Sequence, residues 1–427
     1  MNLIAPTSID SLQTWLDYWT TVHVTAIDLG LERVLPVAHA LDILTPDAKV
    51  FTVAGTNGKG STTTALASIL AAAGYQVGLY QSPHIFHFNE RVKLNGKSVD
   101  DALLIEAFVA VEQARQACNL TLSFFEATTL AAFYIFKVQH CDVWVLEVGL
   151  GGRLDVVNII DADVAVITNI GLDHTDWLGD DVEKIAYEKA GIIRPNIPVV
   201  FAGEQRLPQA IADKVKQENA QLYQYGQDYF VHWSPKAWQL ATNALTLSFA
   251  HGHLAQMNLA AAIMAVLASG LSLTQAMIQQ GVLQAQLPGR FEQRIVQDRK
   301  VILDVAHNPH GVVFLKQQLA FYLQKHPEIE RIHAVFSMLD DKDIHGVVEL
   351  LKEAIEKWYI APLSVPRACK LNRLQQELAT EEVSIAHSVE ESFKQALQQS
   401  SPQDLILVCG SFHTLEAVWE YLLNGDE

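Results

Sequence analysis

The stretch that most constrains the fold runs from Val50 to Leu70, VFTVAGTNGKGSTTTALASIL. A short apolar run breaks at Gly55, a polar turn follows as far as Gly60, and Ser61 then opens an alanine-rich segment of helical character. Glycines let backbone N–H groups turn toward phosphate, and a helix N-terminus favours anions. The order of strand, glycine turn, lysine and helix therefore predicts a nucleotide-phosphate site, with a helix-capping βα turn as the simpler alternative.

The loop departs from the pattern G-x-x-x-x-G-K-[ST] in two places. Val53 stands at the first glycine position, and Gly60 is inserted between Lys59 and the hydroxyl residue Ser61. Lys59 still supplies a full positive charge for phosphate, and Ser61 or Thr62 offers a hydroxyl oxygen to Mg²⁺. The residues alone therefore favour phosphate binding over a purely structural turn.

The composition argues against several other classes of protein. The chain has 427 residues, half of them apolar, which predicts two or three domains with substantial cores. A formal net charge of −18 argues against nucleic acid or an anionic membrane surface as a partner. The four cysteines show no C-x-x-C spacing, the N-terminal MNLIAPTSID lacks a signal-peptide pattern, and the longest apolar run is short for a membrane span. We therefore expect a cytoplasmic protein.

Two further apolar runs end in polar residues. The run VWVLE ends at Glu147 before the turn VGLGGRLD, and the run VAVITNI is followed by GLDHTD, which contains His174. Continuous apolar runs are typical of buried parallel strands, and ligands bind at the carboxyl ends of such strands. A carboxylate at a strand tip suits Mg²⁺, so Glu147 and His174 are candidate metal-binding or acid–base residues, with helix capping as the alternative.

The rest of the first part continues as alternating helices and strands. The expected helices cover 8–22, 127–138, 185–191 and 256–270, and the further expected strands cover 76–80 and 198–203. The apolar run 122–125 precedes Glu126. The alternating residues of 221–249 predict a β-meander that forms an antiparallel edge of the main sheet.

The roles of two residues at helix ends stay open when the sequence pattern alone is considered. Lys189 stands before Gly191, where the ordinary interpretation is a solvated lysine that favours the helix dipole. Asn258 lies in the first turn of an otherwise apolar helix, where a cap and a ligand contact fit equally well.

The break LPGRF predicts a boundary between two domains, residues 1–287 and 288–427. The second part restarts the α/β rhythm, with strands expected over 300–304, 333–337, 357–361 and 404–409. The predicted fold is α/β. It combines an N-terminal P-loop-type domain, which has a mostly parallel sheet and a small antiparallel sheet, with a smaller C-terminal Rossmann-like α/β domain.

Eight motifs, taken in order, resemble the bacterial dihydrofolate synthase/folylpolyglutamate synthase family of the ATP-dependent Mur ligase superfamily. They are AGTNGKGST, QSPH, LEVGLGGRLD, LDHTDWLG, EKAGI, LPGRFE, DVAHNPH and VCGSFHT. The resemblance covers nearly the whole chain, and the glycine after Lys59 is the form that this family uses.

The resemblance implies an ATP-dependent ligase reaction. ATP phosphorylates a carboxylate of dihydropteroate or of a tetrahydrofolate that already carries glutamate. The amine of L-glutamate then attacks the acyl phosphate, which gives an amide, ADP and phosphate. A carboxylate is a poor electrophile, so phosphorylation supplies the leaving group, and the protein mainly positions the reactants and neutralises charge. The partners so implied are dihydropteroate, tetrahydrofolate and its polyglutamates, and L-glutamate. Nothing in the sequence requires more than a monomer, so a monomer is expected.

The same resemblance implies residues for ATP, for Mg²⁺ at two sites and for catalysis. The implied ATP contacts are Thr56, Asn57, Gly58, Lys59, Gly60, Ser61, Asn258, Arg290 and Asp304. The residues matched to Mg²⁺ are Ser61, Ser82, Glu147 and His174, and the implied catalytic residues are Lys59, Lys189 and His174. Lys189 matches a family lysine that becomes N6-carboxylated. The resemblance therefore implies a functional residue, in place of the solvated helix-end lysine that the spacing indicated.

Three segments match those that bind dihydropteroate in bifunctional members. Their residues are Asp28, Leu29, Gly30 and Leu31; Ser123, Phe124, Phe125 and Glu126; and Leu154, Asp155 and Val156. Val156 stands where a smaller residue is expected. His307 and Ser411 are candidates for the glutamate pocket.

Three alternatives stay open at this point. A Mur ligase for a UDP-sugar precursor carries an additional N-terminal domain, for which the short stretch before Val50 leaves no room. A folylpolyglutamate synthase without dihydropteroate activity is the second alternative. The loop at Asp28, which the resemblance matches to dihydropteroate binding, favours the bifunctional form over it. A nucleotide switch or motor would need the phosphate loop but not Lys189 and His174.

Overall fold

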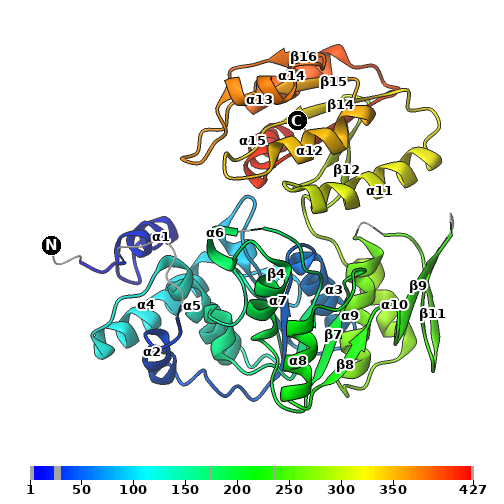
Figure 1. The fold of residues 1–427 in the computed structure, drawn as a ribbon. Helices are drawn as coiled ribbons and strands as arrows, with labels where there is room; N and C mark the ends of the chain where they lie inside the picture. Colours follow the sequence, from blue (N-terminus) through cyan, green and yellow to red (C-terminus); the bar gives the residue numbers. More distant parts are fainter. Residues whose placement is uncertain (1–3, 24–29, 174, 235–236, 253, 425–427) are drawn as a thin grey trace. The chain divides into compact units, whose positions relative to one another are not determined.

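The computed structural model describes residues 4–23, 30–173, 175–234, 237–252 and 254–424. The chain divides into two compact units, which we call the N-terminal unit, Met1–Gly252 with Gln256–Gln286, and the C-terminal unit, His253–Ala255 with Leu287–Glu427 (Figure 1). Each unit has its own apolar core and its own main sheet.

The N-terminal unit is built on an eight-stranded sheet of order β4-β3-β2-β5-β1-β6-β7-β8. All neighbours from β2 to β8 pair in parallel, whereas β3 pairs antiparallel with both β2 and β4. The strand bounds are β1 (Lys49–Ala54), β2 (Val77–Tyr80), β3 (Val92–Leu94), β4 (Lys97–Ser98), β5 (Val143–Glu147), β6 (Val164–Ile167), β7 (Pro198–Phe201) and β8 (Gln221–Gln224). The central strands β5 and β6 are buried along their whole length, and β1 is buried after its first residue, as their continuous apolar sequences predict.

Two groups of helices pack in this unit. α3 (Lys59–Ala72) contacts α9 (Gln256–Ala268) and α10 (Gln275–Gln284), and α4 (Asp101–Cys118) contacts α5 (Phe124–Val138). A Cβ on Gly281 of α10 would lie 2.3 Å from the Ile69 Cα, so glycine permits the close approach of α10 to α3. The other helices are α1 (Leu12–Thr21), α2 (Val34–Ala40), η1 (Phe88–Arg91), η2 (Val156–Ile159), α6 (Thr175–Leu178), α7 (Val182–Ala190) and α8 (Gln209–Gln217).

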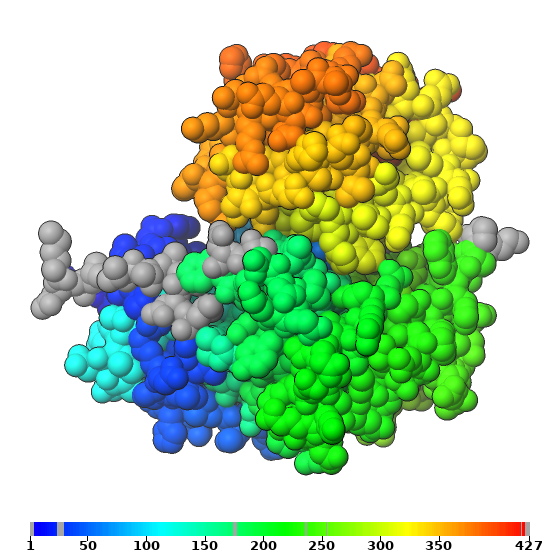
Figure 2. Space-filling view, viewed as in Figure 1, coloured from blue at the N-terminus to red at the C-terminus, as the bar shows by residue number. Residues whose placement is uncertain are grey.

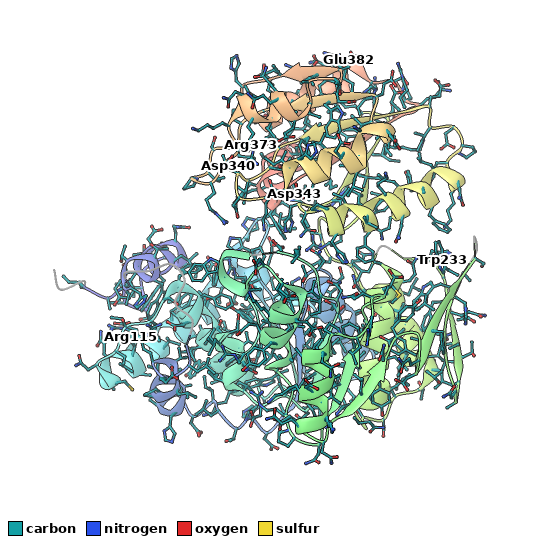
Figure 3. All side chains as sticks on the ribbon, viewed as in Figure 1. Arg115, Trp233, Asp340, Asp343, Arg373 and Glu382 are labelled. Carbon is teal, nitrogen blue, oxygen red and sulfur yellow. The ribbon has the colours of Figure 1, made fainter. Side chains whose placement is uncertain are left out.

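The predicted meander over 221–249 divides between two sheets, so its placement as an antiparallel edge of the main sheet is wrong. The chain passes from β7 through α8 to β8, and this helical crossover makes β8 parallel to β7. The remaining residues form a separate three-stranded antiparallel sheet of order β11-β10-β9. Its strands are β9 (Tyr229–Trp233), β10 (Trp238–Thr242) and β11 (Thr246–Phe249). Trp233, at the end of β9, is 66% exposed (Figure 3).

The C-terminal unit is a six-stranded sheet of order β12-β13-β17-β14-β15-β16, in which only the β12–β13 pairing is antiparallel. Its strands are β12 (Glu292–Val296), β13 (Arg299–Leu303), β14 (Arg331–Phe336), β15 (Lys357–Ile360), β16 (Val383–Ile385) and β17 (Asp404–Cys409). Its helices are α11 (Pro309–Lys325), α12 (Ile344–Leu351), η3 (Lys352–Ala354), α13 (Leu371–Glu377), α14 (Val389–Gln399) and α15 (Phe412–Asn424). The predicted α/β fold class is confirmed.

Helices pack over the sheet of the C-terminal unit. On the face drawn in Figure 2, side chains of the yellow and orange segments, which include α11, α12 and α13, cover this sheet. None of the helices within the described residues is both long and apolar enough to cross a membrane.

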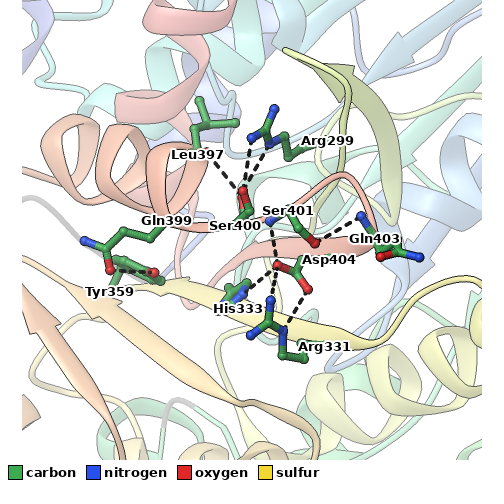
Figure 4. A network of polar contacts seen from close by, with 10 residues as sticks. All are labelled: Arg299, Arg331, His333, Tyr359, Leu397, Gln399, Ser400, Ser401, Gln403 and Asp404. Carbon is green, nitrogen blue, oxygen red and sulfur yellow. Dashed lines mark hydrogen bonds and ion pairs between the residues drawn. The ribbon is translucent and has the colours of Figure 1, made fainter.

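A polar network joins β14, β17 and the turn before β17 in the C-terminal unit (Figure 4). Arg331 donates through Nε and Nη2 to the two carboxylate oxygens of the fully buried Asp404, at 3.0 and 3.1 Å. The Ser401 backbone N–H also donates to Asp404, and His333 Nε2 lies 3.4 Å from the same carboxylate. Burial alone would raise the pKa of Asp404, but these hydrogen bonds lower it below its ordinary value.

Candidate active site

The phosphate loop turns sharply between β1 and α3. Gly58 caps α3 with φ +85°, a left-handed conformation that favours glycine, and the helix begins at Lys59. The Lys59 ammonium folds back and donates to the carbonyl oxygens of Gly55 at 3.0 Å and Thr56 at 3.2 Å. The loop and its lysine thus form one compact structure at the carboxyl end of the central strand.

Residues after β6 hold the phosphate loop in place. Thr168 Oγ1 donates to the Asn57 carbonyl at 2.6 Å, and Asn169 Oδ1 accepts from the Asn57 N–H at 3.0 Å. Thr56 Oγ1 accepts from the Gly171 N–H at 2.9 Å. The sequence-based site prediction missed Thr168 and Asn169, although β6 is the strand next to β1, and the ends of adjacent parallel strands meet at one edge.

Asn258 on α9 lies directly against this loop. A Cβ at Gly58 would come within 2.3 Å of Asn258 Oδ1, so the two residues approach as closely as glycine permits. Asn258 therefore lies beside the loop residues that are matched to ATP in the same unit.

A pocket opens beside the phosphate loop in the N-terminal unit. Its lining comes from the loop, from the glycine-rich turn after β5 and from the segments around α6 and α7; the residues are Gly55, Thr56, Lys59, Gly149, Leu150, Gly151, Asp173, Leu178 and Lys189. Asp173 belongs to the motif LDHTDWLG but was absent from the predicted site. Its neighbour His174, a predicted metal and catalytic residue, lies outside the described residues.

Lys189 is a buried lysine of this pocket, with 4% exposure, so its interpretation from spacing as a solvated helix-end residue is wrong. Its Nζ donates to the Gly55 carbonyl at 3.0 Å. Burial disfavours the ammonium form and Lys59 repels it, which together lower the pKa of Lys189 to about 7 despite the opposing attraction of Asp173. Near neutral pH, a substantial fraction of this side chain is therefore a neutral amine.

Asp155 closes the glycine-rich turn after β5. Its carboxylate accepts from the N–H groups of Leu150 at 2.8 Å and Val157 at 2.9 Å, and it caps η2. Burial raises the pKa of Asp155 to about 6, against the effect of these hydrogen bonds. Of its neighbours in the predicted pterin segment, Leu154 is partly exposed, whereas Val156 is buried.

The candidate metal ligands of the described chain follow adjacent strands. The order β2-β5-β1 places Glu147, at the end of β5, between the segment of Ser82 after β2 and that of Ser61 after β1. Glu147 pairs in register with Val53, and both Glu147 and Ser61 are buried. The topology therefore brings two hydroxyl residues and one carboxylate to the same edge of the sheet.

The segment 123–126 forms the start of α5, which begins at Phe124 and not at Ala127 as expected. Ser123 caps the helix, and the Glu126 carboxylate accepts from the Ser123 N–H at 2.7 Å. Glu126 also accepts from Arg33 Nη2. Ser and Glu at this spacing form a capping box, a signal that the sequence carries and that our prediction missed.

The two phenylalanines of this segment contact different neighbours. Phe124 packs edge-on against Phe88. The Arg91 guanidinium lies over the Phe124 ring, with Arg91 Cζ 5.7 Å from the ring centroid. Phe125 packs against Tyr80, and a Cβ on Gly149 would meet its ring at 2.5 Å. Phe125 thus reaches the turn that lines the pocket.

The other predicted pterin segment is only partly described. Asp28 and Leu29 lie outside the described residues. Gly30 has φ +146°, and the Leu31 carbonyl accepts from the N–H groups of Val34 and Leu35, which places Leu31 in the turn that leads into α2.

In the C-terminal unit, three predicted residues gather at the ends of β13 and β17. Asp304 is buried, and it accepts from the N–H groups of Phe291 and Ala306, both at 2.8 Å. Burial raises the pKa of Asp304, while Arg290 opposes the rise. Arg290 and His307 both contact the ring of Phe412, with Arg290 Cζ 5.3 Å from its centroid.

Ser411 is buried at the start of α15. Its hydroxyl pairs with Thr414 Oγ1 at 2.7 Å and accepts from the Thr414 N–H at 3.0 Å. This geometry is that of a helix cap, so the structure gives Ser411 a structural partner within its own unit.

Comparison with known proteins identifies the family. Residues 53–266 match the Mur ligase middle domain, and residues 289–412 match the glutamate ligase domain of Mur ligases. A dihydrofolate synthase/folylpolyglutamate synthase of Escherichia coli K12 is 43% identical over 98% of this chain and 97% of its own length. The chain belongs to the dihydrofolate synthase/folylpolyglutamate synthase family of Mur ligases. The predicted family and enzyme class, an ATP-dependent ligase of folate metabolism, are thereby confirmed.

Solved structures of this family share the fold. E. coli FolC in complex with DHPP and ADP has a TM-score of 0.93 at 41% identity, over 98% of this chain and 99% of its own. A bifunctional folylpolyglutamate synthase/dihydrofolate synthase with Mn, AMPPNP and L-glutamate bound has a TM-score of 0.91 at 41% identity, over 98% of this chain and all of its own. These relatives therefore bind a nucleotide, and the second also holds a divalent metal.

Proposed function

We propose that this chain ligates L-glutamate to dihydropteroate, giving dihydrofolate, and to tetrahydrofolate and its polyglutamates. The observation that carries the proposal is a pocket in which a phosphate loop, its lysine and a buried lysine of lowered pKa lie together. The ADP, DHPP and L-glutamate bound by relatives support the choice of substrates.

In this proposal the phosphate loop holds and orients ATP. The backbone of Thr56 to Gly60 and the Lys59 ammonium hold the phosphates, and Asn258 adds a contact from α9. Arg290 and Asp304 are assigned to the same nucleotide, because arginine suits phosphate and aspartate suits ribose hydroxyls. Charge neutralisation and positioning then favour attack of the substrate carboxylate on the γ-phosphate.

Mg²⁺ is the proposed metal, at two sites. Hydroxyl and carboxylate oxygens are the ligands that this hard cation prefers, so the donor set of Ser61, Ser82 and Glu147 fits it, together with His174. When bound, Mg²⁺ neutralises the negative charge that develops on the phosphoryl oxygens. Loss of the Glu147 carboxylate should therefore weaken metal binding.

Lys189 is proposed to react with CO₂. Its neutral amine attacks the carbon atom of CO₂ and loses a proton to solvent, which leaves a carbamate with a negative charge in place of a buried cation. Only the neutral form has the lone pair needed, and the lowered pKa of Lys189 supplies that form near neutral pH. The product would add a carboxylate to the proposed metal ligands.

The pterin and glutamate sites complete the proposal. Phe124 and Phe125 offer a flat apolar surface to the pterin ring, beside the turn of Leu154 to Val156 and the segment of Asp28 to Leu31. His307 and Ser411 are assigned to L-glutamate. We also propose that the enzyme acts in the cytoplasm as a monomer.

A folylpolyglutamate synthase without dihydropteroate activity is the second candidate. Val156 favours it, because this buried side chain stands, where a smaller residue is expected, in a segment matched to dihydropteroate binding. The larger side chain would narrow the space available to dihydropteroate in that segment.

Transfer of oxygen-18 tests the proposed reaction directly. Dihydropteroate labelled in its carboxylate should give labelled inorganic phosphate, because the oxygen that bridges carbon and phosphorus leaves with phosphate when L-glutamate attacks. Product formation with unlabelled phosphate would contradict the acyl-phosphate route, and tetrahydrofolate labelled at its glutamate carboxylate provides the matching measurement for the second substrate.

A further inference from the structure

Gln81 is a buried polar residue that the proposed mechanism does not use. It follows β2 immediately, is 5% exposed, and its backbone N–H donates to the Arg91 carbonyl at 2.9 Å. Its covalent neighbour is Ser82, a proposed metal ligand. Contacts that hold Gln81 in place therefore also hold the start of the segment that carries Ser82.

The Gln81 side chain reaches across to the first turn of α3. Its Nε2 lies 2.8 Å from the Gly60 carbonyl oxygen and 2.9 Å from the hydroxyl oxygens of both Thr63 and Thr64. Strand β5 separates β2 from β1 in the sheet, but α3 contacts both β5 and β2, which brings its first turn to Gln81. The amide thus connects the end of β2 with the first turn of α3, although β5 separates β2 from β1, the strand that precedes α3.

The orientation of this amide is fixed by its partners. The Gly60 carbonyl can only accept a hydrogen bond, so the NH₂ group must face it. On the other side, Lys93 Nζ can only donate, and it lies 3.5 Å from Gln81 Oε1. A glutamate or an apolar side chain could not satisfy both sides in this way.

The network extends to the residues that flank Gly60. Thr63 Oγ1 lies 3.0 Å from the Lys59 carbonyl oxygen and 3.1 Å from the Gly60 carbonyl oxygen, so this hydroxyl also hydrogen-bonds to the backbone of the first turn of α3. Gly60 lies between Lys59 and Ser61, the proposed phosphate and metal residues. Through Gly60 and Thr63, Gln81 therefore restrains the backbone that carries Ser61.

We propose that Gln81 is a positioning residue that sets the separation of Ser61 and Ser82 and so tunes the affinity for the divalent metal. This inference rests on the proposed function, in which both serines ligate Mg²⁺. A cation needs its ligands at fixed short distances, so a small displacement of one serine weakens metal binding more than it weakens contacts to the nucleotide itself.

The test compares Gln81→Met with Gln76→Met in the full-length protein. Methionine keeps an unbranched chain of similar length and removes the amide. Gln76 stands at the opposite, amino end of the same strand, where its Oε1 accepts from Asn95 Nδ2 at 2.6 Å, so it serves as a matched control. Binding of Mn²⁺ in the presence of AMPPNP is measured by electron paramagnetic resonance, and binding of AMPPNP in EDTA by calorimetry.

Gln81→Met should raise the dissociation constant of Mn²⁺ about tenfold, which corresponds to about 1.4 kcal/mol, and leave AMPPNP binding in EDTA unchanged. Gln76→Met should change neither. An unchanged Mn²⁺ affinity in Gln81→Met would overturn the inference. So would an equal loss of both affinities, because a general disturbance of the phosphate loop would then explain the effect.

Thr63→Val provides a second variant within the same network. It should weaken Mn²⁺ binding in the same direction, and its effect should not add to that of Gln81→Met, because the two residues share their contacts. If Gln81→Met does not fold, a Thr63→Val protein with unchanged Mn²⁺ affinity overturns the inference by itself. Because neither measurement needs turnover, a wild-type protein that binds Mn²⁺ with AMPPNP but ligates no glutamate would reject the proposed reaction separately.

Discussion

At the scale of single residues, Lys189 has a strongly perturbed environment in the pocket. Its pKa is about 7 in the folded chain and 10.5 in the ordinary, solvated state. Between these values the unfolded chain binds more protons than the folded chain, so the free energy of unfolding should rise with pH. Below about pH 7 both states are protonated, and the cost of the buried ammonium is fully present.

Urea unfolding of wild type and Lys189→Met, in buffer depleted of CO₂, checks this sign. Between about pH 7 and pH 10 the wild-type free energy of unfolding should rise more steeply than that of Lys189→Met. Lys184 is a control on the same helix, since its side chain is 63% exposed. A Lys184→Met protein should keep the wild-type slope, whereas equal slopes in wild type and Lys189→Met would contradict the burial of an ionisable amine.

The carbamate proposed at Lys189 has a direct spectroscopic test. Wild-type protein equilibrated with ¹³C-bicarbonate should show a carbamate carbon resonance that is absent from Lys189→Ala. Lys189→Ala should also lose at least about tenfold in turnover, because a metal-binding carboxylate is missing, and a small added carboxylate should restore part of it. Full activity without any carboxylate would mean that the residue acts only in packing.

At the scale of elements, two glycines at the ends of α3 offer a matched comparison. Gly58 has φ +85° and Gly74 has φ +89°, so alanine strains the backbone similarly at both, by roughly 1–2 kcal/mol. A Cβ at Gly74 meets nothing within 4 Å, whereas one at Gly58 clashes with Asn258.

Gly58→Ala should therefore weaken binding of ATP at least about tenfold, while Gly74→Ala should lower stability and leave nucleotide affinity unchanged. Replacement of Asn258 by alanine in the Gly58→Ala background should recover part of the stability that the clash removes. Calorimetric titration with AMPPNP and urea unfolding measure the two quantities. Equal nucleotide affinities in the two glycine variants would contradict the close contact of α9 with the loop.

The elements differ in how far the sequence could predict them. The loop from Gly55 to Lys59 and the strands that end near Glu147 and Ile167 follow from local patterns, because buried parallel strands have continuous apolar sequences. The direction of β8 depends on the crossover through α8, which no pattern within 221–249 encodes. The burial of Lys189 depends likewise on its contact with Gly55, a residue far away in the sequence.

At the scale of the whole molecule, each unit should owe its stability to its own core and polar contacts. In the C-terminal unit, Asp404 is fully buried and bound by Arg331, whereas Asp340 pairs with Arg373 at 2.8 Å with both side chains partly exposed (Figures 3 and 4). Asp404→Asn should lower the free energy of unfolding by about 2 kcal/mol, because it weakens hydrogen bonds to a buried charge.

Asp340→Asn is the control for this comparison, and it should cost less than about 1 kcal/mol because exposed ion pairs contribute little. Urea unfolding followed by tryptophan fluorescence, with Trp358 buried in this unit, compares the two variants. Equal effects would mean that the network in Figure 4 adds no more than a surface pair.

Glutamate-dependent release of ADP tests the central claim most directly. Purified protein with Mg²⁺ and ATP is given L-glutamate together with dihydropteroate or, separately, with tetrahydrofolate, and Lys59→Ala is measured beside it. The account predicts turnover with both pterins, dependence on L-glutamate, and loss of turnover in Lys59→Ala. Turnover with tetrahydrofolate alone would leave a folylpolyglutamate synthase, and near-normal activity of Lys59→Ala, or no glutamate-dependent turnover with either pterin, would contradict the account.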